Sequence, residues 1–215
     1  MLNLEAVRNH EEEDENRMAT AILAPRPTII DAILHGRGLA YQIALIVAGS
    51  LLVALSAQIT IPLPVVPLTG QTYAVLLVGA LLGSRRGGLS MLFYLIEGEL
   101  GLPFFARTGG TPTLGYIFGF VLAGFMVGWL AERGWDRNFK SAVAAMAVGE
   151  VAIYLLGLPW LAMFVGWSTA ITAGLVPFIP GDVVKLLLAA ATLPGGWRLL
   201  RAATPKSGRG NPRGK

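Results

Sequence analysis

A long uncharged stretch limits what this chain can fold into. No Asp, Glu, Lys or Arg occurs from residue 38 to residue 84, between Arg37 and Arg85. Across the chain 54% of the residues are hydrophobic and only 14% are charged. Soluble domains carry about 25% charged residues, whereas about 20 apolar residues form a helix that crosses a bilayer. The sequence therefore predicts an all-α integral membrane protein in a lipid bilayer.

Apolar runs divide the chain into six predicted transmembrane helices, at residues 38–57, 68–84, 87–102, 113–131, 141–156 and 181–200. The linker QITIPLPVVPLTGQ contains three prolines, at 62, 64 and 67, which predict an extended outer loop. The segment 157–180 is interrupted by Gly and Pro, and we expect short helices that cap the outer surface there.

The distribution of positive charge predicts the orientation. If both termini are cytoplasmic, the inner segments, together with Arg198 at the inner end of the last predicted span, hold all 17 Lys and Arg residues except Arg107 and Lys185. We therefore expect a multi-pass membrane protein with both termini in the cytoplasm. It would consist of a polar N-terminal tail (1–37), a six-helix membrane domain (38–200) and a basic, disordered C-terminal tail (201–215).

Enzymatic chemistry finds little support in the sequence. Both histidines, His10 and His35, precede the first predicted span, there is no cysteine, and no G-x-x-x-x-G-K-[ST] loop occurs. Glu150 and Asp182 are the candidate intramembrane carboxylates, and no sequence rule brings them together. We expect no enzyme activity, no metal or cofactor, and no nucleic-acid partner.

The stretch PGDVVK places two opposite charges at the start of the last span. Asp182 and Lys185 are spaced i, i+3 and share one face of a helix. Ionisable groups inside a membrane cost enough free energy to suggest function, so the pair is a candidate ligand site. A structural alternative is that Asp182 caps the helix and Lys185 merely pairs with it.

Other polar residues are weaker candidates. Glu150 and Tyr154, spaced i, i+4, either line the same cavity or reflect a protonated glutamate bonded between helices. Arg107 is the basic residue of the predicted outer loops, where it is either inert or a ligand contact. Three aromatic residues are expected to form an interfacial belt rather than a binding box: Trp160, Trp167 and Phe178.

Several longer stretches resemble one family. They are AQITIPLPVVPLTGQTYAVLLVGALLGSRRGGLSMLFYLIEGELGLPFFA, GYIFGF, IYLLGLPWLAMFVG and PFIPGDVVKLLLAA, and they occur in that order. They resemble the BioY family, the biotin-specific substrate-binding component (S component) of energy-coupling factor transporters, over residues 40–200. The resemblance implies an S-component-like bundle in the cytoplasmic membrane of a prokaryote, which binds biotin near its outer face and takes it up into the cell.

The resemblance also implies roles for particular residues. Asp182 and Lys185 would bind biotin, with Arg107 or Thr108 and Tyr116 as neighbours. This chain departs from the family in the shorter loop RTGGTPTLGY and in Glu150, where relatives commonly carry asparagine. An S component for another vitamin, or a helical scaffold that transports nothing, are the alternatives.

Uptake against a gradient needs energy that this chain does not supply, since it has no nucleotide loop and no series of intramembrane carboxylates. Ala40, Ala44 and Ala48 recur at i, i+4 and i+8, so they either pack internally or let a partner helix approach. In the family, small residues spaced in this way contact a transmembrane coupling subunit that joins two ATPases, although some members are reported to work alone.

Overall fold

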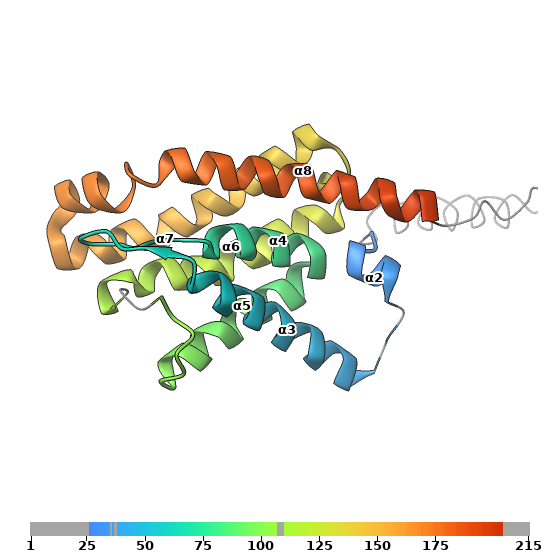
Figure 1. The fold of residues 1–215 in the computed structure, drawn as a ribbon, viewed down its shortest axis with the longest axis horizontal. Helices are drawn as coiled ribbons and strands as arrows, with labels where there is room; N and C mark the ends of the chain where they lie inside the picture. The colour runs from blue at the N-terminus through green and yellow to red at the C-terminus, as the bar shows by residue number, and fades with distance from the viewer. Residues whose placement is uncertain (1–25, 35, 37, 107–109, 204–215) are drawn as a thin grey trace, which may run out of the picture.

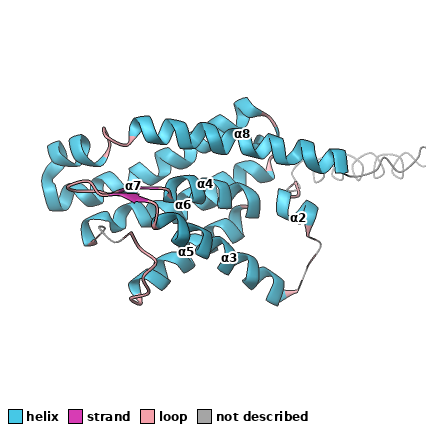
Figure 2. Cartoon of the chain, viewed as in Figure 1, coloured by secondary structure: helices cyan, strands magenta, loops and turns pink. Residues whose placement is uncertain are grey.

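The chain folds into a bundle of α-helices with one short hairpin (Figures 1 and 2). The structure is a computed structural model, which describes residues 26–34, 36, 38–106 and 110–203. The helices in this part are α2 (Ile29–Ile33), α3 (Leu39–Ala57), α4 (Gln71–Leu82), α5 (Ser84–Glu99), α6 (Leu114–Glu132), α7 (Phe139–Gly174) and α8 (Ile179–Ala203). Single 3₁₀ turns, η1 (Thr111–Thr113) and η2 (Trp135–Arg137), precede α6 and α7.

The proline-containing linker is extended, as its sequence predicts. Its ends form strands β1 (Thr60–Ile61) and β2 (Leu68–Thr69), which pair antiparallel with Thr60 opposite Thr69. The hairpin leads directly into α4, so it places the polar residues at the start of that helix beside the other helix ends.

Four of the described helices are long and apolar enough to cross a membrane: α3, α6 with η1, α7 and α8. The predicted spans 68–84 and 87–102 fold as α4 and α5, but these helices have 12 and 16 residues. Both are shorter than the roughly 20 residues that a simple span requires. By length and composition the structure therefore supports four of the six predicted spans.

Helix α7 is longer than the sequence predicts. It continues through Pro159 and reaches Gly174, with a break at Gly166, where φ is 77°. Glycine adopts this left-handed conformation without the steric cost of a side chain. Fully buried Leu161 holds the segment after Pro159 against the bundle. Residues 157–165 thus extend the preceding helix, and a short helix begins only after Gly166.

Helix α6 lies at the centre and packs against α4, α5 and α7. Three glycines allow the close crossing of α4, α5 and α6: Gly79, Gly87 and Gly124. A methyl carbon added to Gly79 or Gly87 would lie 2.8 or 2.9 Å from the Gly124 carbonyl oxygen. Small residues of this kind let membrane helices approach closely. The outer helices are α3, which packs on α4 and α5, and α8, which packs on α4 and α7 (Figure 1).

Part of the predicted N-terminal tail packs against this bundle. Thr28 and Asp31 form a capping box for α2, which explains why a short helix forms within a polar segment. Ile29 is 5% exposed and belongs to an apolar cluster with Leu76 of α4. The Asp31 carboxylate accepts two hydrogen bonds from Arg86, at 2.7 and 2.8 Å, which tie α2 to α5. Residues 1–25 of this tail lie outside the described residues.

This ion pair leads to a prediction about stability. Burial acts to raise the pKa of Asp31, but hydrogen bonds from Arg86 and Thr28 and the charge of Arg86 outweigh it and lower the pKa below 3.8. Arg86→Gln should therefore lower the free energy of unfolding by about 0.2–1 kcal/mol at pH 7, because the pair is partly exposed. The difference should shrink as the pH falls below 3.8 and vanish once the pH lies below the lowered pKa of Asp31, since the carboxyl is then protonated in both proteins.

Thermal unfolding in detergent at pH 7 and pH 3 measures the effect. Arg85→Gln is the matched control, because the adjacent Arg85 is exposed and should tolerate the change. Equal losses from both substitutions would contradict a specific role for the ion pair.

Candidate ligand-binding site

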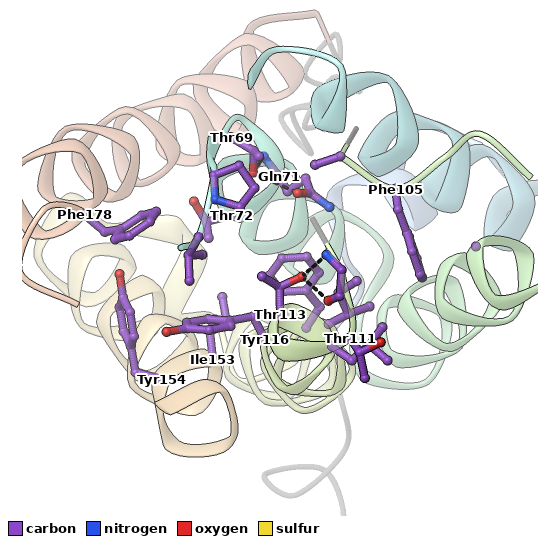
Figure 3. Close-up of a pocket in the computed structure, with 18 of the residues that line it drawn as sticks. Thr69, Gln71, Thr72, Phe105, Thr111, Thr113, Tyr116, Ile153, Tyr154 and Phe178 are labelled. Atoms are coloured by element: carbon purple, nitrogen blue, oxygen red, sulfur yellow. Dashed lines mark hydrogen bonds between the residues drawn. The ribbon is translucent and has the colours of Figure 1, made fainter. Parts of the chain in front are cut away.

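A cavity of about 260 Å³ lies beside the β1–β2 hairpin, between the starts of α4, α6 and α8 and the middle of α7 (Figure 3). Much of its wall is apolar, including Val66, Phe105, Leu114, Ile117, Phe120, Ile153 and Phe178. Polar side chains also line it: Thr69, Gln71, Thr72, Glu99, Thr111, Thr113, Tyr116, Tyr154, Asp182 and Lys185. Apolar walls with a few convergent polar groups are typical of small-molecule sites.

Asp182 and Lys185 lie at this cavity on the first turns of α8. The Lys185 ammonium donates to Asp182 Oδ1 at 3.1 Å. The Lys185 side chain is 16% exposed and the Asp182 side chain is 8% exposed. Helix α8 begins at Ile179, three residues before Asp182, so Asp182 is not the capping residue. Within the described part of the chain its carboxylate accepts hydrogen bonds from side chains only. The pair is therefore built into the cavity wall rather than into a helix cap.

Two tyrosines complete this side of the site. The Tyr154 hydroxyl donates to Asp182 Oδ2, and the Tyr116 hydroxyl donates to the Gly174 carbonyl oxygen at 2.9 Å. Their rings pack edge to face, with centroids 6.1 Å apart. The hydrogen bond and the ring contact fix the orientation of Tyr154 and, through it, of the Asp182 carboxylate.

The start of α4 supplies polar groups that the sequence analysis did not assign. Lys185 donates its second hydrogen bond to Thr72 Oγ1 at 3.0 Å, across 113 residues of chain. Gln71 Nε2 donates to the Tyr94 hydroxyl at 2.7 Å, and Gln71 Oε1 accepts from Thr69. The polar stretch TGQT, which leads from β2 into an otherwise apolar helix, is the signal that could have identified them.

Glu150 does not line the cavity. It lies on α7 one turn from Tyr154, is 7% exposed, and has no hydrogen-bond partner for either carboxylate oxygen among the described residues. Neither alternative from the sequence, a cavity-lining carboxylate or a hydrogen bond between helices, describes this arrangement. Arg107 and Thr108 lie outside the described residues, although their neighbours Ala106 and Gly110 line the cavity.

The predicted aromatic belt is wrong for one of its three members. Phe178 is 7% exposed and lines the cavity. Trp167, by contrast, is 59% exposed, as a belt residue would be. Trp160 donates its indole N–H to the Thr111 carbonyl oxygen at 2.8 Å, so it holds the loop that leads into α6.

From the sequence, Glu150 and Asp182 were named as the candidate intramembrane carboxylates, and a third one was missed. Glu97, on α5, is 8% exposed and accepts a hydrogen bond from the hydroxyl of fully buried Ser50 on α3. This contact joins α3 to α5, and neither residue lines the cavity. Among the described residues no group of three or more His, Cys, Asp or Glu side chains could hold a metal ion.

The three alanines of α3 lie on a surface of the described chain. Ala40, Ala44 and Ala48 are all exposed, so they do not pack against the described part of the bundle. Leu55, further along the helix, is 68% exposed. In the apolar 18-residue segment of α3 only 22% of the residues are buried, whereas 61% are buried in the corresponding segment of α6. This face is free to contact lipid or another helix.

Comparison with known proteins gives a consistent result. The model of the BioY family matches residues 27–202. A probable biotin transporter BioY of Pyrococcus horikoshii is 40% identical over 152 residues, which cover 68% of this chain and 90% of that protein. A biotin transporter BioY of Thermotoga maritima is 40% identical over 146 residues, covering 65% of this chain and 85% of the relative.

A solved structure shares the fold. It is the S-component for biotin from an ECF-type ABC transporter, with a TM-score of 0.62 and 22% sequence identity. The match covers 77% of this chain and 93% of the solved chain. Together with the apolar helices, these similarities identify a multi-pass membrane protein.

Proposed function

Because the chain belongs to the BioY family, we propose that it binds biotin and takes it up as the substrate-specific component of an energy-coupling factor transporter. The observation that carries this proposal is the cavity in which Asp182, Lys185 and Thr72 meet apolar walls. The family consists of transporter components rather than enzymes, and the site is proposed to bind its ligand unchanged.

The chemistry of biotin fits such a cavity. Its ureido ring carries two N–H donors and a carbonyl, its thioether ring is apolar, and its valerate chain ends in a carboxylate. Asp182 is suited to the ureido N–H groups, because a carboxylate is a charged acceptor. Lys185 is suited to the ligand's carbonyl or carboxylate oxygen, since its ammonium has three donors and uses two on Asp182 and Thr72. The apolar walls are suited to the thioether ring and the aliphatic chain.

The orientation in the membrane follows from the charges. We place the Arg85–Arg86 turn and both termini on the cytoplasmic side of the plasma membrane, because Lys and Arg favour that side. The cavity lies beside the hairpin, at the Glu99 end of α5 and the Leu114 end of α6. The opposite ends of these two helices carry Arg85 and Glu132. It would then face outward, where a scarce vitamin is captured.

Energy for uptake would come from partners. A transmembrane coupling subunit with two ATPases would supply it, and the exposed face of Ala40, Ala44 and Ala48 on α3 is the proposed contact for the coupling subunit. This contact is tested in the Discussion.

Titration calorimetry on the purified protein tests the ligand. We expect tight binding of biotin and no measurable binding of riboflavin or thiamine, with no chemical change in the biotin recovered. Biotin methyl ester, which lacks the carboxylate charge, is the matched ligand that measures how much that charge contributes. Preference for riboflavin or thiamine would contradict the choice of vitamin, and retention of no vitamin would favour a scaffold.

A further inference from the structure

Glu150 is a buried carboxyl one turn from the cavity wall that the proposed function does not use. Both of its carboxyl oxygens are inaccessible to solvent and have no hydrogen-bond partner among the described residues. Four residues earlier, Met146 belongs to the apolar cluster with Leu76 and Ala189. Four residues later, Tyr154 lines the cavity. Glu150 thus lies in the layer between the cavity and an apolar cluster.

The charged groups that act on Glu150 come from α8. They are Asp182, which repels a negative charge at this position, and Lys185, which attracts one. On α7 itself the neighbouring ionisable group is Tyr154, whose hydroxyl donates to Asp182. These three groups line the cavity, and Glu150 lies one turn of α7 from Tyr154, outside the cavity wall.

The 3₁₀ turn η2, which carries Asp136 and Arg137, packs on α7 but directly precedes its first residue, Phe139, whereas Glu150 lies further along the helix. The longer helices that pack on α7 beside α8 are α4 and α6, and they add no compensating charge. Helix α4 contains one ionisable residue, Tyr73, and α6 contains Tyr116 near the cavity and Glu132 at its opposite end. The sequences of both helices contain no Lys, Arg or His. A charge on Glu150 would therefore depend on Lys185 alone.

Lys185 is already paired. Its ammonium donates to Asp182 and Thr72, and Asp182 uses both of its oxygens, on Lys185 and Tyr154. The pair is electrically neutral, so an ionised Glu150 would add one uncompensated negative charge in a buried layer. Burying an unpaired carboxylate is costly, and such a group stays neutral instead.

From this arrangement we propose that Glu150 is a proton-binding site whose occupancy controls the affinity of the cavity for an anionic ligand. The protonated form leaves the site neutral and accepts the ligand's carboxylate. The ionised form makes the site negative and repels it. By thermodynamic linkage the ligand favours protonation of Glu150 as much as protonation favours the ligand. This inference rests on the proposed function, because it requires a carboxylate ligand such as biotin.

The test compares the dissociation constant for biotin at pH 6 to 9 in the unmodified protein and in Glu150→Gln, which mimics the neutral acid. We expect the unmodified protein to lose affinity with rising pH, by up to about tenfold per pH unit where Glu150 titrates. Glu150→Gln should retain its pH 6 affinity over a wider range. Tyr73→Phe is the control, and it should reproduce the unmodified profile because Tyr73 does not line the cavity.

Two further measurements separate Glu150 from Asp182 and Lys185. Calorimetry in buffers of different ionisation enthalpy should show proton uptake on biotin binding in the unmodified protein, and less in Glu150→Gln. Biotin methyl ester, which carries no charge, should show little difference between the two proteins at any pH.

Particular results would overturn the inference. They are identical pH profiles for the unmodified protein and Glu150→Gln, or higher affinity in Glu150→Gln at every pH without a change in proton uptake. The second result would mean that Glu150 is ionised and competes with the ligand for Lys185. Absence of biotin binding by the unmodified protein at all pH values would instead contradict the proposed function.

Discussion

Lys185→Met is expected to weaken biotin binding by roughly 10- to 150-fold, which corresponds to about 1.5–3 kcal/mol. Methionine approximates the length of lysine but has neither the charge nor the donors. The substitution removes the hydrogen bonds to Thr72 and Asp182 at the cavity wall, as well as the donor proposed for the ligand. The measurement is the dissociation constant of biotin by calorimetry, with Asp182→Asn expected to lower affinity as well.

A structural role for the pair gives a different pattern in the double variant. Lys185→Met leaves the buried Asp182 carboxylate with the Tyr154 hydroxyl but without a counter-charge, so it should also lower stability. Adding Asp182→Asn removes that unpaired charge and should recover stability without recovering affinity. If affinity returned together with stability, the pair would serve the fold rather than the ligand. Unchanged affinity in both single variants would have the same meaning.

Thr72→Val is the matched control for the charge. It removes the hydroxyl that accepts from Lys185 and leaves the Asp182–Lys185 ion pair in place. Thr72→Val should cost less affinity than Lys185→Met, because it keeps the ammonium that is proposed to donate to the ligand. A hydrogen bond from a charged donor contributes more than one between neutral groups.

The apolar runs and the local spacings made much of this site predictable. Asp182 and Lys185 could be paired from their i, i+3 spacing, because helix geometry alone brings them together. Thr72 could not be added in the same way, since its contact with Lys185 joins α4 to α8 through the tertiary packing of the bundle. The same applies to Ser50 and Glu97, which meet between α3 and α5.

Helix ends were harder to predict where packing overrides local preference. Pro159 favours a helix break, yet α7 continues because Leu161 is buried beyond it, and the break occurs at Gly166 instead. In the N-terminal segment the polar composition suggested a tail. The capping box of Thr28 and Asp31 was a local signal for α2, but the ion pair with Arg86 depends on the folded bundle.

Ala44→Trp is expected to abolish biotin uptake while leaving biotin binding intact. Ala44 is exposed on α3, in the middle of the three alanines, and it is not part of the cavity wall. A small residue permits close approach of a partner helix, and an indole ring at this position would hold the coupling subunit away. Uptake of labelled biotin by cells, and the dissociation constant of the purified variant, are the two measurements.

Leu188→Trp is the matched control for this effect. Leu188 is 56% exposed on α8, so the substitution adds an indole ring to a different exposed helix without touching α3. It should leave both uptake and binding near their original values. Co-purification of the coupling subunit should follow uptake, being lost with Ala44→Trp and retained with Leu188→Trp.

If Ala44→Trp took up biotin at the full rate, the α3 face would not be the contact. If cells without any coupling subunit took up biotin through the unmodified protein, the partner itself would be dispensable, because the chain would then move its ligand alone.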